Sequence, residues 1–340
     1  MPTKSDINAA FAICAAIIGA GFASGREIVS FFSALGSASW VGVIASSTAS
    51  SLLIYVIMRL SRHTRALTLP RIYGALMGQR CRDALSLLHG LLCLCAASVM
   101  LSAGAELGAL TFSVQHSHAL GLLLTLCAAL VSLKLGLNSL GTLGGILTVI
   151  TVPYYIAIAS GSQAASSFSA NGLLQAVPLG LLYAAFNAAL AGGTICLSAR
   201  QSASPVRTAC MAGILLFLLL ACANRAMLSA DEDILRTALP SVALAARWGV
   251  AGYYASIAVM WLAVLTTLCA MLHSLSALLT EEAHLPRRNA LICGTLCACA
   301  LSICGFETLV NAAYPILGWV CTFALIVLML FLPESSESPD

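Results

Sequence analysis

Two charged side chains stand inside an apolar segment near the start of the chain. The segment reads Gly19-Ala20-Gly21-Phe22-Ala23-Ser24-Gly25-Arg26-Glu27, and apolar residues follow it at 28–32. Each glycine costs about 1 kcal/mol relative to alanine inside a helix, so three of them favour a break. Close packing of helices through small residues would explain the glycines, but not the arginine and glutamate. Because charges within a membrane span indicate a functional site, we predict a broken helix here.

A second polar stretch lies in the other half of the chain, at Tyr183-Ala184-Ala185-Phe186-Asn187 and then Gly192-Gly193-Thr194. Alone it is a weak signal, because Asn and Gly also join packed helices. Matching interruptions in two halves are typical of a transporter site, since unwound backbone offers carbonyl groups to cations and helix ends to charged solutes. From these two stretches the predicted solute-binding residues are Ala20, Gly21, Ala23, Ser24, Gly25, Tyr183, Phe186 and Asn187.

The remaining reactive residues give weaker signals. Glu106 lies near one end of an apolar segment, where it reaches the membrane surface or faces a cavity. In a cavity, Glu106 or Glu27 would bind a cationic group or carry a coupling proton. Most of the 14 cysteines lie in apolar segments, where a thiol packs as a small hydrophobic group. Cys293 and Cys297 share a helical face, but no His or carboxylate accompanies them, so packing is preferred to a soft-metal site.

The elements that position these residues are membrane helices. Of the 340 residues, 60% are hydrophobic and 9% are charged, and the mean hydropathy is +0.97; soluble domains carry about 25% charged residues. This composition predicts an all-α integral membrane protein in a lipid bilayer and excludes a soluble enzyme, a nucleic-acid-binding protein and a disordered scaffold. With about 20 apolar residues needed per span, ten spans are expected, near residues 7–35, 40–60, 84–112, 119–135, 140–160, 173–199, 209–228, 242–280, 290–304 and 309–332.

The order of the spans divides the chain into two halves, residues 1–165 and 166–333, followed by a disordered tail at 334–340. Five spans per half is an odd number, so two halves of the same fold would form an inverted repeat. Most of the 16 Lys and Arg residues fall on the side of the N-terminus, which predicts both termini in the cytoplasm and a multi-pass protein of the plasma membrane.

At this point the stretch from Gly19 to Ile28, with Phe31 and Phe32, resembles the opening helix of the YkvI-like membrane proteins. These are a branch of the amino acid–polyamine–organocation superfamily. Residues 183–187 and 313–318 are similar to the same branch, and the resemblance spans essentially the whole chain. It implies a 5+5 inverted-repeat fold of the neurotransmitter:sodium symporter type, with broken first and sixth helices.

The resemblance also implies an ion site. In those symporters, two adjacent hydroxyl side chains and a carbonyl one turn earlier bind sodium together with carbonyls of the broken first helix. Carried over, the Na⁺ ligands are the side chains of Thr266 and Thr267 and the backbone oxygens of Ala263, Gly19 and Phe22. The alternative is that both threonines only bond the preceding helical turn. Thr267 and Met271 would also line the solute cavity.

Two gate pairs follow from the same resemblance. Lys4 and Glu281 would close the inner side, and Arg26 and Glu307 the outer side, although Arg26 lies nearer the break than the symporter arginine does and could pair with Glu27 instead. The third span has Ser102, Gly104 and Glu106 where amino-acid symporters place a tyrosine. The identity of the solute therefore stays open.

The expected function is secondary active transport by alternating access of a small amino-acid-like or amine solute, coupled to Na⁺. The first alternative is H⁺ coupling through Glu106 or Glu27, and the second is a ligand-sensing receptor that does not transport. An enzyme is the weakest interpretation, because no catalytic triad, metal motif or phosphate-binding loop has workable spacing. We expect a small-molecule solute as partner, no nucleic acid and no cofactor besides Na⁺; the oligomeric state stays open.

Overall fold

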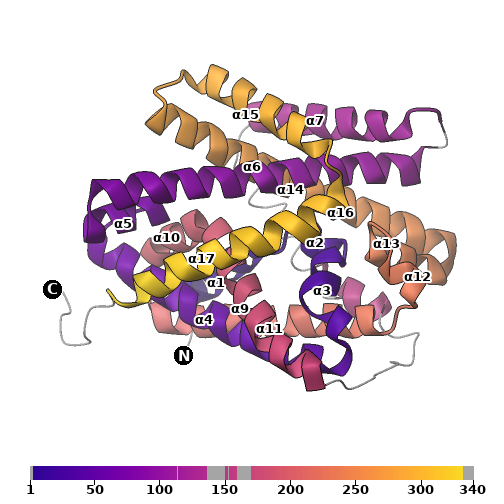
Figure 1. Cartoon of the computed structure of the whole chain (residues 1–340), viewed down its shortest axis with the longest axis horizontal. Coiled ribbons are helices and arrows are strands. Elements are labelled where there is room, and N and C mark those ends of the chain that lie inside the picture. Colours follow the sequence, from indigo (N-terminus) through magenta and orange to yellow (C-terminus); the bar gives the residue numbers. More distant parts are fainter. Residues whose placement is uncertain (1–2, 113, 136–149, 152, 159–169, 332–340) are drawn as a thin grey trace.

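The computed structural model describes residues 3–112, 114–135, 150–151, 153–158 and 170–331, and the regular secondary structure in these ranges is helical (Figure 1). The helices are α1 (Lys4–Ile17), α2 (Ala20–Ala23), α3 (Arg26–Phe31), α4 (Ser39–Thr64), α5 (Leu69–Met77), α6 (Gln79–Thr111), α7 (Ser117–Leu135), α9 (Ala170–Leu190), α10 (Gly192–Gln201), α11 (Pro205–Leu228), α12 (Glu232–Leu235), α13 (Pro240–Ala245), α14 (Gly249–Glu282), α15 (Arg287–Ser302), α16 (Phe306–Thr308) and α17 (Tyr314–Met329).

In these ranges, seven helical segments are long and apolar enough to cross a membrane. They match the second, third, fourth, sixth, seventh, eighth and tenth of the ten expected spans. The first span is divided among α1, α2 and α3, and the ninth is the 16-residue α15. Most of the fifth expected span lies outside the described residues.

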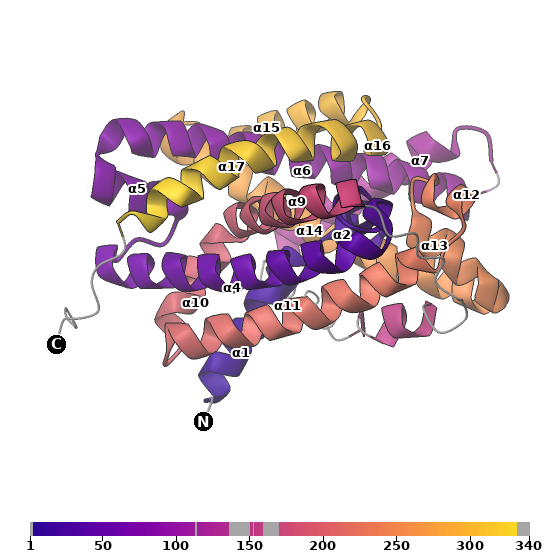
Figure 2. The ribbon, with the colours of Figure 1, turned by 60° about the horizontal axis from the view of Figure 1, so that its bottom comes forward.

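The helices form two packed groups. In one, α6 and α14 lie against each other and carry α7 and α15; in the other, α4 packs against α9 and α11, and α11 against α1 (Figures 1 and 2). The short α2 contacts α14 and α6, while α3 contacts α11 and α9. The broken first span therefore lies where the two groups meet.

The two ends of the molecule differ in charge. Helices α5 and α10 lie at one end, and α12 and α13 at the other (Figure 2). At the α5 end, Arg62 donates to the carbonyls of Ala199 and Ser202, and Arg71 and Arg82 pair with two glutamates at the end of α14. We refer to this as the basic end.

The predicted break in the first span is confirmed. Helix α1 ends at Ile17, and the next residue leaves the helical conformation with ψ 87°. Gly25 has φ +78°, a left-handed conformation that favours glycine. A Cβ at Gly25 would also lie 2.7 Å from Sδ of Met227, so both backbone and space require glycine where α3 begins.

The interruption in the sixth span is shorter and later than predicted. Helix α9 runs through Tyr183 and Asn187 without unwinding, and only Ala191 separates it from α10. Even there the backbone bonds persist, because the N–H of Ala191 donates to the carbonyl of Asn187 at 2.9 Å. The Asn187 side chain donates to the carbonyl of Tyr183 one turn earlier, so this buried amide is satisfied without a break.

Candidate functional site

The carboxylate of Glu27 lies against the backbone of the helix break. A Cβ at Gly21 would stand only 1.9 Å from Oε1 of Glu27, so only glycine leaves room for this carboxylate. Glu27 is 6% exposed, and the hydroxyl of Tyr183 in α9 donates to its Oε2 at 3.3 Å. The break thus contains a buried acidic group that the chain itself supplies.

Aromatic rings surround this carboxylate. Tyr183 packs edge-on against Phe31 and Phe32, with ring centroids 5.3 and 5.1 Å away. Tyr155 and Tyr314 are buried and lie within electrostatic range of Glu27. The predicted site residue Phe186 stacks on Tyr314 at 4.4 Å. The neighbours of Glu27 that these contacts identify are therefore tyrosines, with further aromatic rings packed on them.

The carbonyl groups of the break accept hydrogen bonds from other residues of the chain. Tyr155 donates to the carbonyls of Phe22 at 2.5 Å and Ala23 at 3.2 Å. The Ser24 hydroxyl donates to the carbonyl of Gly21 at 2.8 Å. Ser241 of α13 contributes its hydroxyl to Ala23 at 2.7 Å and its N–H to Ser24 at 2.9 Å. We expected this backbone to be open to a ligand, and in this conformation it is not.

Helices α12 and α13 cover the break; we call residues 232–245 the cover segment. Besides the two bonds from Ser241, Arg26 donates to the carbonyls of Leu235 at 3.0 Å and Thr237 at 3.3 Å. Arg26 also pairs with Glu307 of α16. The structure thus places the expected outer gate pair together, and Arg26 does not pair with Glu27.

The five predicted Na⁺ ligands are not assembled as a set. Gly19 and Thr267 are neighbours, since a Cβ at Gly19 would lie 3.3 Å from Oγ1 of Thr267. The Thr266 hydroxyl, however, is directed to carbonyls of its own helix, Leu262 at 3.0 Å and Ala263 at 3.1 Å. The Phe22 carbonyl accepts from Tyr155 and from the N–H of Gly25 at 3.0 Å, which occupies both of its lone pairs. In this conformation the Phe22 carbonyl therefore has no lone pair left for a cation, and its role as a Na⁺ ligand stays a prediction.

The expected inner gate pair, Lys4 with Glu281, is not formed in this conformation and stays a prediction. Lys4 is exposed, and Glu281 pairs with Arg71 of α5 at 3.1 Å. The start of α1 is held by Asp6, which is fully buried. Asp6 accepts from the N–H groups of Ala203 and Ser204 at 2.9 Å each, and from Arg207 at 3.0 Å. The sequence signal for this anchor is the spacing of Thr3 and Asp6, which form a capping box at the start of α1.

Two other predicted residues lie on the long helices. Glu106 is near the end of α6, where its half-exposed carboxylate is 3.9 Å from Nε2 of His118 in α7. Met271 is buried in α14, one turn after Thr267. Tyr155 was not predicted, although a tyrosine in an apolar span needs a partner for its hydroxyl.

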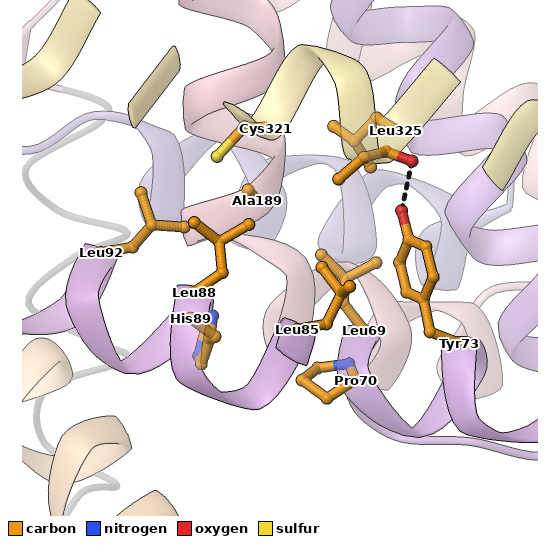
Figure 3. A pocket seen from close by; sticks show the side chains of 11 residues that line it. Leu69, Pro70, Tyr73, Leu85, Leu88, His89, Leu92, Ala189, Cys321 and Leu325 are labelled. Carbon is orange, nitrogen blue, oxygen red and sulfur yellow. Dashed lines mark hydrogen bonds between the residues drawn. The ribbon is translucent and has the colours of Figure 1, made fainter. Parts of the chain in front are cut away.

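Two cavities occur elsewhere in the structure. One of about 20 Å³ lies among α5, α6, α9 and α17, where the Tyr73 hydroxyl donates to the carbonyl of Ala324 (Figure 3). That volume is room for about one water molecule. The other, about 310 Å³, is an open groove between α4 and α11 that includes Thr48 and Val206. Neither of these two includes a residue of the break.

Comparison with known proteins gives a structural match. No family model matches the sequence, and no curated protein matches it. Among solved structures, the crystal structure of MhsT in complex with L-phenylalanine superposes with a TM-score of 0.63 at 14% identity, covering 99% of this chain and 91% of that chain. The chain is therefore a multi-pass helical membrane protein with the fold of MhsT.

Proposed function

We propose that the protein is a secondary active transporter that moves a small amine or amino-acid-like solute by alternating access. The observation that carries this proposal is the buried Glu27 carboxylate at a helix break, placed where two groups of helices meet and closed by the cover segment. A buried charge at a broken helix is what a solute site in a membrane requires. The fold of MhsT, which was solved with L-phenylalanine, supports the same reading.

In this mechanism the group containing α1, α4, α9 and α11 rocks against the group containing α6 and α14. Opening toward one side requires release of the cover segment, with its Arg26 contacts. Opening toward the basic end requires release of pairs such as Arg71 with Glu281. Both closures include polar contacts that would have to break. Exposed pairs contribute about 0–1 kcal/mol each, which suits closures that must reopen.

Sodium is the proposed coupling ion, bound near Gly19, Thr266 and Thr267 with the carbonyls of Ala263 and Phe22. The proximity of Gly19 and Thr267 supports this placement. Binding would require the Tyr155 hydroxyl to leave Phe22. Tyr155→Phe should therefore raise the thermal stabilisation given by Na⁺ over K⁺. Tyr154→Phe is the control, because the Tyr154 hydroxyl bonds Ser241 and Ser256 and not the Phe22 carbonyl.

The test of transport is uptake into proteoliposomes with an inward Na⁺ gradient, a pH gradient or neither. Radiolabelled amines and amino acids serve as solutes, and vesicles containing no protein set the background. The proposal expects accumulation above equilibrium under an ion gradient. It fails if the gradients leave flux unchanged, or if no amine or amino acid enters.

H⁺ coupling is the second candidate, and the burial of Glu27 without a cation favours it. A carboxylate in such a site can hold a proton on one side of the membrane and release it on the other. Glu106 fits this role less well, because it is half-exposed beside His118. Uptake driven by a pH gradient, lost in Glu27→Gln and kept in Thr267→Ala, would select H⁺ over Na⁺. Saturable binding with no flux or counterflow would select a ligand-sensing receptor.

A further inference from the structure

Glu27 has no cationic partner in the part of the chain that the structure describes. Its carboxylate accepts a hydrogen bond from the neutral hydroxyl of Tyr183 at 3.3 Å. The neighbouring Arg26 is engaged with Glu307 and with the carbonyls of the cover segment. A buried carboxylate is stable as an anion only when a cation and further hydrogen bonds accompany it. As an anion, Glu27 would therefore need a cation from outside the described chain, and without one it would hold a proton instead.

The surroundings of Glu27 indicate what kind of cation fits. Phe31, Phe32 and Tyr183 present fully buried aromatic rings. Aromatic faces attract an organic ammonium group, and their apolar surface receives a hydrocarbon chain. The carbonyls of Gly21, Phe22 and Ala23 already accept hydrogen bonds, so a bare metal ion would find few oxygen ligands there. An alkylammonium needs fewer, because one carboxylate and a tyrosine oxygen suffice for its donors.

The Glu27 carboxylate also disfavours a solute that carries a carboxylate of its own. A solute with its own carboxylate would bring like charge next to Glu27 in a site shielded from water, where such repulsion is strongest. Glu27 also fills the space beside Gly21, to within 1.9 Å of where a Cβ would stand. The carboxylate of an amino acid would therefore have to occupy the space beside the break that the Glu27 carboxylate already fills.

We propose that Glu27 is the counter-ion for the ammonium group of the solute, and that the solute is a small apolar primary amine and not an amino acid. This inference rests on the proposed transport function and names the substrate class of its site. It assigns Tyr183 the role of orienting the carboxylate through its hydroxyl. Release of the cover segment would admit the amine.

Binding to the purified full-length protein tests the proposal without requiring transport. The probes are two pairs that differ only in a carboxylate: isopentylamine with L-leucine, and 2-phenylethylamine with L-phenylalanine. Dissociation constants are measured by calorimetry and checked by thermal shift. We expect each amine to bind at least about tenfold more tightly than its amino acid, and Glu27→Gln to weaken amine binding by at least about tenfold. Asp83→Asn, which changes an exposed carboxylate near the start of α6, should leave amine binding unchanged.

Three results would overturn the assignment: an amino acid that binds as tightly as its amine, unchanged amine affinity in Glu27→Gln, or no amine binding at all. A Na⁺-dependent stabilisation that Glu27→Gln removes, with amines inert, would assign the carboxylate to the metal ion instead. The wild-type pairs decide the question even if the Gln variant does not fold. Amine binding without flux would support this inference and contradict the transport proposal, whereas gradient-driven uptake of amino acids that amines do not inhibit would do the reverse.

Discussion

Gly21 and Glu27 depend on each other at the scale of single residues. The glycine has no side chain, so the carboxylate of Glu27 can rest on the backbone of the break. The glutamate in turn gives the break a charge that burial makes costly unless a cation arrives. Gly25 serves a different purpose, because its left-handed conformation lets α3 begin. The glycines of this stretch therefore have separate causes, which composition alone does not distinguish.

Gly21→Ala should impair the site more than the fold. The new methyl group would have to displace the Glu27 carboxylate, which is the mobile end of a side chain and not backbone. We predict at least about tenfold weaker binding of 2-phenylethylamine with a stability loss of about 1–3 kcal/mol, measured by calorimetry and thermal unfolding. Gly193→Ala is the matched control, because no atom from outside its own helical turn lies within 4 Å of the added Cβ. Equal amine binding by both variants would contradict the proposed contact.

The sequence identified the charged residues of the site but not their contacts. Glu27 was predicted to be functional because it is a charged residue in an apolar span. Tyr183 was predicted because it lies in the same polar stretch as Asn187. Tyr155 was missed because its partners, the carbonyls of Phe22 and Ala23, come from a segment more than 130 residues away in the chain. Glu281 was assigned to Lys4 by analogy of spacing, but Arg71 stands nearer in the fold. Pairings of this kind depend on tertiary geometry.

At the scale of elements, the cover segment lies over the break and is bonded to its backbone and to Arg26. Its helices α12 and α13 have only four and six residues, too few to be stable alone. The segment is therefore held by its contacts, and those of Ser241 reach the carbonyl groups of Ala23 and Ser24. Loss of a few bonds should open it.

Ser241→Ala should loosen the cover segment. The variant loses the hydroxyl bond to Ala23 but keeps the backbone bond to Ser24, so about 1 kcal/mol is removed. Hydrogen–deuterium exchange of residues 240–245 should be about fivefold faster, with little change in α6. Thr237→Ala is the control, since its hydroxyl bonds Ile234 within the same segment. Unchanged exchange in Ser241→Ala would show that other contacts hold the segment closed.

The spans were the most predictable elements, because apolar length is local information. The break at residues 19–25 was predictable for the same reason, as glycines and charges stand together there. The sixth span was less so, since Asn187 satisfies its amide on the preceding turn and α9 continues to Leu190. Asn and Gly are compatible with either a packed helix or an unwound one. The hydrogen-bond partner of the Asn side chain decides which of the two forms.

Asp6, which precedes the first apolar segment, should contribute stability over most of the pH range. Burial opposes its charge, but hydrogen bonds from Ser204 and Thr3, with the charge of Arg207, keep the pKa of Asp6 below its usual range. A depressed pKa gives stability that is complete above the unfolded value, about 4, and is lost as the pH falls through the folded value. Asp6→Asn should therefore lower the melting temperature equally from pH 5.5 to 8, and the deficit should shrink only in stronger acid.

Asp83→Asn is the matched control for this measurement, because Asp83 is exposed and its side chain accepts a hydrogen bond from the nearby Gln79. Its melting temperature should match that of the wild type throughout. A deficit in Asp6→Asn that changes between pH 6 and 8 would contradict the direction of the pKa shift. It would point instead to a group that titrates near neutrality.

At the scale of the whole molecule, charge divides the two ends more clearly than sequence order does. Arginines from α4, α5, α6 and α10 gather at the basic end, where they bond helix C-termini and glutamates. Asp231 and Glu232 lie beside Arg247 and Arg236 at the opposite end. Residues far apart in the chain thus produce a difference in charge between the two ends, and such a difference determines orientation during membrane insertion.

This difference in charge predicts that the basic end, with the N-terminus, faces the cytoplasm, because arginines are retained on that side during insertion. An epitope tag inserted between residues 232 and 233, in an exposed helix with no buried residue, should be stained by antibody in intact spheroplasts. The same tag at the N-terminus should be stained only after permeabilisation. Matched expression and melting temperature control for misfolding. Staining of the N-terminal tag alone in intact spheroplasts would reverse the orientation, and the cover segment would then close the cytoplasmic side of the Glu27 site.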